Sequence, residues 1–139
     1  MAPPRDDPVP APTPDPAPGE RDSAYDLFQR GSRMLAERHP GAAAVLLERA
    51  LALEPGKASI LEALGQAYFN VGSHDLAAQR FGEIVEADPL AHYAHFGLGL
   101  SRARLGDARL ARRHLRMAVF LKPENESYQR ALARFEDAA

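Results

Sequence analysis

The side chains of this sequence best suited to chemistry are histidines, because an imidazole can bind a metal or transfer a proton near neutral pH. They are His39, His74, His92, His95 and His114. Only His92 and His95 share a helical face, at the spacing i, i+3, and no placed carboxylate accompanies them. Two imidazoles alone are a weak metal signal, so the sequence favours helix-start or surface positions for the histidines.

Cysteine chemistry and the common catalytic motifs are missing from the sequence. Cysteine is absent, which excludes a thiol nucleophile, a thiolate metal site and a disulfide. No phosphate-binding loop, nucleophile elbow or Glu-x-x-His pair occurs, so no reaction class follows and no cofactor is predicted. The N-terminus has no apolar signal-peptide core and no apolar run is long enough to span a membrane, which makes the cytoplasm the expected location.

Four arginines form a basic run that can contact phosphates or an anionic surface. They are Arg109, Arg112, Arg113 and Arg116. The whole chain has a formal charge of −2, and residues 1–22 carry about −3, so the remainder carries only about +1. A nucleic-acid binder is expected to be strongly basic. The favoured interpretation of the run is therefore a solvated helix face, and nucleic acid is not predicted as a partner.

Prolines, glycines and alanines recur at a fixed step of 34 residues. The recurring residues are Pro55, Pro89 and Pro123; Gly31, Gly65 and Gly99; and Ala43, Ala77 and Ala111. The columns between them are mostly apolar, as in the series Leu47, Phe81 and Leu115. A fixed period of this length indicates an internal repeat whose units stack on one another.

This pattern resembles the tetratricopeptide repeat family over residues 24–125, with units at residues 24–57, 58–91 and 92–125. The middle unit fits the family pattern best. Arg30 and Arg102 stand where a leucine and a tyrosine are usual, and Ile84 stands where a small residue is usual. The resemblance implies an all-α solenoid of three antiparallel helix pairs followed by a solvating C-terminal helix.

The repeated glycines need a packing reason, because glycine within a helix costs about 1 kcal/mol relative to alanine. We expect Gly65 to face Ala77 and Gly99 to face Ala111, so that paired helices approach closely. Turns separate helices of about 13 residues, a length set by the repeat. In these turns, we expect Asp75 and Asp107 to cap the next helix.

The sequence divides into a tail and one folded domain. Residues 1–22 hold eight of the twelve prolines and few large apolar side chains, so they are predicted to be disordered. The tail contains no PxxP motif, and its alternating prolines favour a stiff spacer over a docking motif. Residues 23–139 form the repeat domain. Tyr128, Leu132 and Phe135 give residues 124–137 one apolar helical face, so residues 126–139 are assigned as the cap helix.

The resemblance implies that the first helix of each unit lines a concave groove. Side chains on those helices and the cap helix that the repeat core does not use form the predicted binding surface. They are Tyr25, Phe28, Ser32, Glu62, Gln66, Phe69, Asn70, Tyr93, Phe96, Leu100, Arg104, Arg130 and Arg134. Several are apolar, and an exposed apolar patch usually marks an interaction site. The alternative is that some pack between repeats, or that Tyr25 and Phe28 cover the first repeat.

Charge suggests what the groove holds. Arg104, Arg130 and Arg134 make its C-terminal end basic, and Glu62 is an isolated acid near its middle. A partner with apolar anchors and an acidic flank fits this distribution. Relatives that hold the C-terminal carboxylate of chaperones use lysine and asparagine at set positions. Those positions here carry Phe28, Ser32, Ala63, Tyr93 and Gly97, so binding of chaperone tails is not predicted.

Two functions fit such a chain. The first is a protein-interaction adaptor, or scaffold, that binds a partner peptide or helix in its groove, with the tail providing reach. The second is a small chaperone that holds an extended client segment, as chaperones of bacterial secretion systems do. A monomer is expected. Richness in alanine, arginine and proline hints at a bacterial coding sequence.

Overall fold

The computed structural model describes residues 22–136, so the predicted tail up to residue 21 and the last three residues lie outside the described part. This part contains seven helices and no strand. The helices are α1 (Ala24–Ala36), α2 (Pro40–Leu53), α3 (Ala58–Val71), α4 (His74–Ala87), α5 (His92–Arg104), α6 (Ala108–Leu121) and α7 (Glu126–Glu136). Their lengths of 11 to 14 residues match the predicted length.

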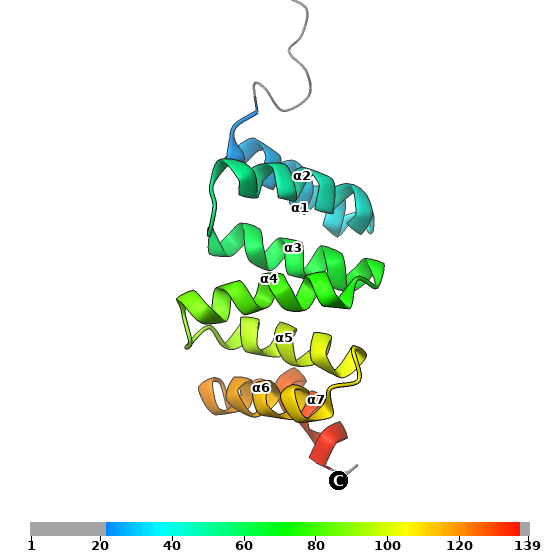
Figure 1. Ribbon diagram of the computed structural model, residues 1–139, viewed down its shortest axis with the longest axis vertical. Coiled ribbons are helices and arrows are strands. Elements are labelled where there is room, and N and C mark those ends of the chain that lie inside the picture. Colours follow the sequence, from blue (N-terminus) through cyan, green and yellow to red (C-terminus); the bar gives the residue numbers. More distant parts are fainter. Residues whose placement is uncertain (1–21, 137–139) are drawn as a thin grey trace, which may run out of the picture.

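The helices stack in chain order, from α1 at one end to α7 at the other (Figure 1). Each helix packs most closely on its neighbours in sequence, and α3 also contacts α1 and α5 directly. This arrangement confirms the predicted all-α solenoid of three helix pairs closed by a further helix. No helix in the described part is both long enough and apolar enough to cross a membrane.

Polar side chains cap the starts of α1 and α6. The Ser23 hydroxyl accepts a hydrogen bond from the Asp26 N–H at 3.1 Å, and the Asp26 carboxylate accepts one from the Ser23 N–H at 3.4 Å. This reciprocal pair is a capping box, which fixes the start of α1. Asp107 caps α6 as predicted, accepting from the Leu110 N–H at 3.1 Å.

The prediction for Asp75 is wrong. Ser73 is the N-cap of α4, and Asp75 lies inside the first helical turn. Gly72 has a φ of +88° and ends α3, so the next helix is capped at Ser73, two residues before Asp75. In its actual place the Asp75 carboxylate still favours the helix, because the positive end of the helix dipole lies there.

The expected pairing of Gly99 with Ala111 is present, because a Cβ atom on Gly99 would lie 3.2 Å from the Ala111 carbonyl oxygen, but the shortest contacts of the repeated glycines are with larger side chains. A Cβ atom on Gly31 would lie 2.7 Å from Leu47, one on Gly65 would lie 2.6 Å from Phe81, and one on Gly99 would lie 2.8 Å from Leu115. The large side chain one turn beyond each alanine therefore occupies the space that glycine leaves. The alanines remain fully buried and permit the close helix approach from the other side of the pair.

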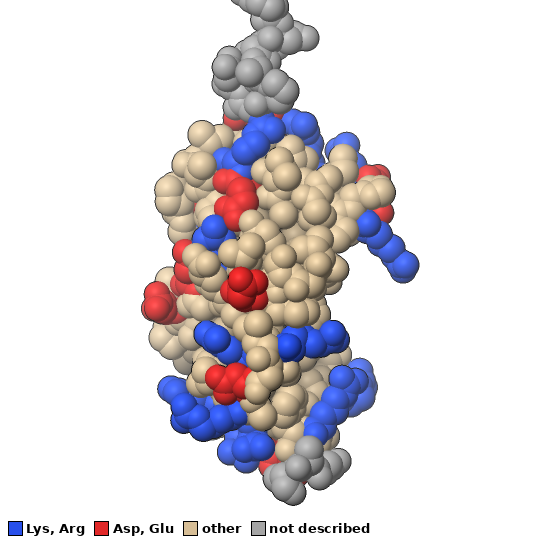
Figure 2. Space-filling model, turned by 45° about the vertical axis from the view of Figure 1, so that its right-hand side comes forward, with Lys and Arg blue, Asp and Glu red and all other residues tan. Residues whose placement is uncertain are grey.

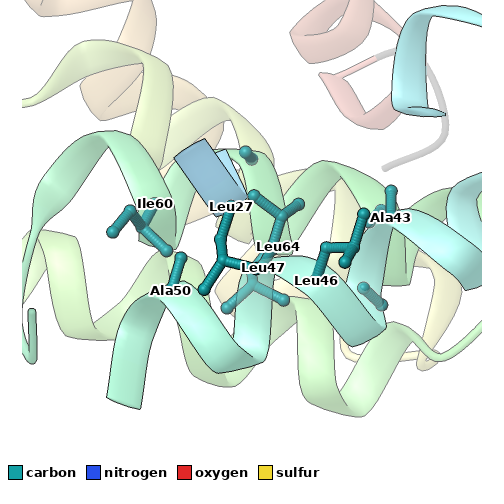
Figure 3. Packing of buried hydrophobic residues seen from close by; sticks show 10 residues of the cluster. Leu27, Ala43, Leu46, Leu47, Ala50, Ile60 and Leu64 are labelled. Carbon is teal, nitrogen blue, oxygen red and sulfur yellow. The ribbon is translucent and has the colours of Figure 1, made fainter. Parts of the chain in front are cut away.

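The core consists of two clusters that follow the repeat. The first joins α1, α2 and α3, where Leu27, Leu47 and Leu64 meet (Figure 3). The second joins α3, α4 and α5 and includes Phe81 and Ile84. Ile84 is buried despite standing at a position where a small residue is usual. The same core columns repeat in successive pairs, which keeps the first helices of the units on one side of the stack.

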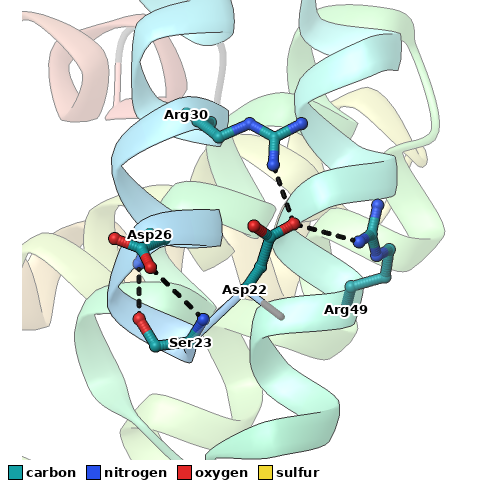
Figure 4. Close-up of polar contacts among 5 residues, drawn as sticks. All are labelled: Asp22, Ser23, Asp26, Arg30 and Arg49. Carbon is teal, nitrogen blue, oxygen red and sulfur yellow. Dashed lines mark hydrogen bonds and ion pairs between the residues drawn. The ribbon is translucent and has the colours of Figure 1, made fainter. Parts of the chain in front are cut away.

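Asp22 joins the described domain through ion pairs. Its carboxylate lies 2.9 Å from an Arg30 nitrogen and 3.5 Å from an Arg49 nitrogen (Figure 4). Arg30 occurs where a core leucine is usual, and it lies at the surface with its charge paired. At this position the first repeat therefore has an ion pair in place of the usual apolar contact of a leucine. The predicted boundary between the tail and the domain, after residue 22, stays a prediction.

Candidate functional site

Three connected pockets run along the faces of α1, α3, α5 and α7 and together form the groove. The first pocket, of about 490 Å³, lies between α1 and α3; the central pocket, of about 310 Å³, lies between α3 and α5; and the C-terminal pocket, of about 390 Å³, reaches α7. Glu62, Gln66 and Asn70 border both the first and the central pockets. Phe69, Phe96 and Leu100 border both the central and the C-terminal pockets.

All but one of the predicted binding residues line the groove. Phe28 and Ser32 border the first pocket, and Tyr93 borders the central pocket. The exception is Tyr25, which borders a fourth pocket beside the start of α1 with Glu54, Lys57 and Ile60; Phe28 and Ser59 line both this pocket and the first one. Tyr25 is 67% exposed and its hydroxyl accepts a hydrogen bond from Gln29. Tyr25 thus lies beside the N-terminal end of the groove, and its part in binding stays a prediction.

The floor of the central pocket was not predicted from the sequence. Phe81 of α4 reaches it because Gly65 and Gly97, on the two flanking helices, leave room for the ring. The repeat pattern assigns Phe81 to the helix-pair core, where it is indeed buried. Gly97 stands outside the 34-residue glycine series. This additional glycine is the feature of the sequence that could have indicated a pocket above Phe81. The result is an aromatic floor beneath an apolar pocket.

Aromatic side chains form the walls of the central pocket and are partly buried. Phe69 and Tyr93 pack against the second core cluster. The ring of Phe96 packs against that of Tyr128 of α7 in a tilted arrangement, with centroids 4.6 Å apart, and the Tyr128 hydroxyl lies 2.7 Å from His92 Nδ1. The alternative of packing between repeats thus holds for part of each ring. These contacts hold the wall rigid, which lowers the entropy cost of binding.

The C-terminal pocket is lined by basic side chains. The Arg104 guanidinium lies over the Phe69 ring, 5.4 Å from its centroid. Arg130 is paired with Glu126 at 3.7 Å, an exposed pair of little strength. Arg134 forms no ion pair within residues 22–136, and Glu136 is paired with Arg116 instead. Guanidinium groups in this pocket therefore remain accessible to a carboxylate.

Glu62 is the acidic residue that lines the groove within residues 22–136. Its side chain is half-buried and forms no hydrogen bond or ion pair with the residues described. Burial raises the pKa of this carboxyl, because removal of water disfavours the charged form. Burial also raises the pKa of Tyr93, with the negative charges of Glu62 and Asp88 adding to the effect.

Two histidines meet away from the groove. His95 is buried, and its ring stacks on His114 with the two Nδ1 atoms 3.2 Å apart. His95 Nε2 lies 2.8 Å from the Pro89 carbonyl oxygen, to which it can only donate. Neutral His114 then donates to His95 Nδ1. Burial lowers the pKa of His114 to about 4, with His95 and nearby arginines adding to the effect.

The predicted helix-start or surface position holds for three histidines, whereas His95 is buried and His114 is half-buried within α6. His39 is the N-cap of α2, and His74 and His92 are the first residues of α4 and α5. His95 and His114 are 19 residues apart and meet only through the packing of α5 on α6. The residues described include no group of three or more metal-capable side chains.

The basic run on α6 lies outside the groove. Arg109 and Arg113 are exposed, and Arg116 contacts Glu136 of α7 at 2.9 Å. Figure 2 shows basic side chains on both sides of the lower, C-terminal half of the stack. The arginines of the C-terminal pocket and those of α6 are therefore separate sets.

The geometry defines a helical repeat protein with a groove on the faces of its first helices. The family model named tetratricopeptide repeat matches residues 28–81 and 62–126, so the chain belongs to that family. It is 30% identical over 105 residues to the tetratricopeptide repeat and J domain-containing co-chaperone DNJ1 of Cryptococcus neoformans var. grubii. The alignment covers 76% of this chain but only 20% of the co-chaperone.

Solved structures share the fold. The first tetratricopeptide domain of Spaghetti (RPAP3), bound to the HSP90 peptide SRMEEVD, superposes with a TM-score of 0.79 at 17% identity over 84% of this chain and 92% of that one. The second such domain of human RPAP3, in complex with the HSP70 peptide SGPTIEEVD, gives a TM-score of 0.77 at 19% identity over 81% and 94%.

Proposed function

We propose that this protein is an interaction adaptor that binds a segment of a partner protein in the groove. The observation that carries the proposal is the central pocket, where a rigid aromatic wall and the Phe81 floor leave about 310 Å³ for an apolar side chain. Apolar pockets beside a few placed polar groups are the usual form of a binding site. The pocket lies midway along a longer groove, which suits an extended chain or a helix.

The arginines beside the central pocket favour a partner with an acidic flank. Arg104, Arg130 and Arg134 line one pocket, and guanidinium groups bind carboxylates through two parallel hydrogen bonds. We infer that the acidic group of the partner, or its terminal carboxylate, binds here while the neighbouring apolar side chain fills the central pocket.

The two RPAP3 domains are solved with acidic peptides, but this chain does not share the chaperone-tail clamp. Its clamp positions carry Phe28, Ser32, Ala63, Tyr93 and Gly97, which offer no cation. The basic groups of its groove lie instead at the end next to α7. We therefore propose an acidic partner other than the chaperone tails.

A chaperone that holds an extended client segment is the second candidate. The length of the groove, which spans three pockets from α1 to α7, favours it, as does the match to a co-chaperone. Co-expression separates the two candidates: a client needs the protein in order to stay soluble, whereas the partner of an adaptor is soluble alone. We further propose a cytoplasmic, bacterial and monomeric protein without catalytic activity.

Peptide selection tests the binding function directly. A random peptide library is panned against the full chain, against Leu100→Asp in the groove and against Phe120→Asp on α6. Leu100 borders two pockets of the groove, whereas Phe120 is 79% exposed outside it. We expect a consensus with an apolar and an acidic residue, retained by Phe120→Asp and lost in Leu100→Asp. An identical consensus for both variants would place binding elsewhere.

A further inference from the structure

Glu62 is the acidic side chain in the middle of the groove lining within residues 22–136. It borders both the first and the central pockets, and it has no ion pair or hydrogen bond within residues 22–136. The polar side chains that share these two pockets with it, Gln66 and Asn70, are neutral, so the lining of neither pocket supplies a cation. A half-buried charge of this kind is costly until an opposite charge approaches it.

The position of Glu62 on α3 relates it to the basic end of the groove. Glu62 precedes Phe69 by seven residues on the same helix, which is a rise of about 10 Å at 1.5 Å per residue. Arg104 lies over the Phe69 ring. Glu62 and the Phe69 ring that carries Arg104 are therefore about 10 Å apart along α3, and both line the central pocket together with Phe81.

An extended peptide covers that separation with about three residues, at roughly 3.3 Å per residue. A segment whose carboxylate binds at Arg104 thus places a side chain about three residues away opposite Glu62. The side chain between them faces the apolar central pocket. Opposite charges at these two points satisfy both centres and fix the direction of the segment, which a purely apolar groove leaves undetermined.

We propose that Glu62 makes the groove selective for extended partner segments that carry a lysine or arginine about three residues from an acidic group, with an apolar residue between them. This inference rests on the proposed function, because it names the partner chemistry of the same groove. Because Glu62 is negative and Arg104 is positive, the groove complements a segment that carries both a positive and a negative charge.

The test compares peptide selection by the full-length wild type with selection by Glu62→Gln and Glu62→Lys. We expect the wild type to enrich a basic residue about three positions from the acidic one. Glu62→Gln should lose that enrichment while keeping the apolar and acidic positions, and Glu62→Lys should enrich an acid there instead. Thermal unfolding followed by circular dichroism verifies that each variant is folded. If Glu62→Lys does not fold, the comparison of the wild type with Glu62→Gln is enough for the test.

A synthetic peptide measures the size of the effect. Replacing the selected basic residue by serine should weaken binding to the wild type about tenfold, as expected for a charge-assisted contact, and should leave binding to Glu62→Gln unchanged. An apolar and acidic consensus without a basic position, equal in wild type and Glu62→Gln, overturns this inference and leaves the proposed function standing. No consensus from any variant overturns both.

Discussion

The ring of Phe81 lies against Gly97, where a Cβ atom would come within 2.6 Å of the ring carbons. Gly65 flanks the same ring from α3 at an equally short distance. The two glycines hold the ring between α3 and α5 and open the central pocket above it. A core residue of α4 thereby becomes part of the groove, so stability and binding are coupled at this point.

Gly97→Ala should lower the stability of the protein by about 1 to 3 kcal/mol, because the added methyl group overpacks the Phe81 ring. Gly82→Ala is the matched control. Gly82 also lies in a helix, but nothing lies within 4 Å of its Cβ position, so alanine should stabilise the protein by up to about 1 kcal/mol through helix propensity. Urea unfolding measures both changes. A gain of stability in both variants would contradict the observed contact.

Leu64→Ala should destabilise the protein by about 2 to 5 kcal/mol, because it opens a cavity in the first core cluster. Leu64 is fully buried, at a column of the repeat where leucine is expected. Leu53→Ala makes the same chemical change at a side chain that is 53% exposed and should cost less than about 0.5 to 1 kcal/mol. Equal losses in urea unfolding would show that the repeat register is wrong.

Phe96 should contribute to stability as well as to the groove. Phe96→Ala removes the aromatic contact with Tyr128, so we expect a loss of about 1 to 3 kcal/mol and early unfolding of α7. Phe120→Ala, at a phenylalanine that is 79% exposed, is the control and should have little effect. Thermal unfolding with hydrogen exchange at α7 measures both. An unchanged α7 in Phe96→Ala would separate Phe96 from the cap.

The repeat itself was predictable because small and large residues recur at a fixed period, and each of them is required by the local packing of one helix pair. The series of Gly31, Gly65 and Gly99 specifies a close helix pair whatever its exact partner, so the fold followed even though Leu47, Phe81 and Leu115 make shorter contacts with the glycines than the alanines do. The groove residues on α3 and α5 followed from the same helical spacing.

The remaining features depend on contacts between helices that spacing within one helix does not encode. His95 and His114 meet across α5 and α6, and the sequence gives no sign of which of five imidazoles face one another. Tyr25 shares a helical face with Phe28, but the pocket that it borders also includes Glu54 and Ile60 from either side of the connection between α2 and α3, which the spacing within α1 does not encode. The place of Asp75 was decided by the turn at Gly72.

The histidine pair should make stability depend on pH. His114 stays neutral in the folded protein because its pKa is lowered to about 4, whereas the unfolded chain binds a proton near pH 6.5. A lowered histidine pKa stabilises the folded state above pH 6.5, and that stabilisation is lost as the pH falls from 6.5 toward 4. His114→Gln lacks this contribution, so its urea midpoint should fall less between pH 7 and pH 5. Parallel declines would show that His114 is solvated.

Reversing Arg130 and Arg134 to glutamate should weaken peptide binding, because two of the three cations of the C-terminal pocket become acids. The double reversal of Arg109 and Arg113 is the matched control, since it makes the same change in charge at exposed positions of α6 outside the groove.

Wild-type affinity for a selected acidic peptide should also fall as salt rises, because exposed charges are screened within about 10 Å at 0.1 M. Fluorescence anisotropy at two salt concentrations measures all three proteins. Equal losses in both double variants would reduce the effect to net charge, whereas unchanged, salt-independent binding would leave a purely apolar groove.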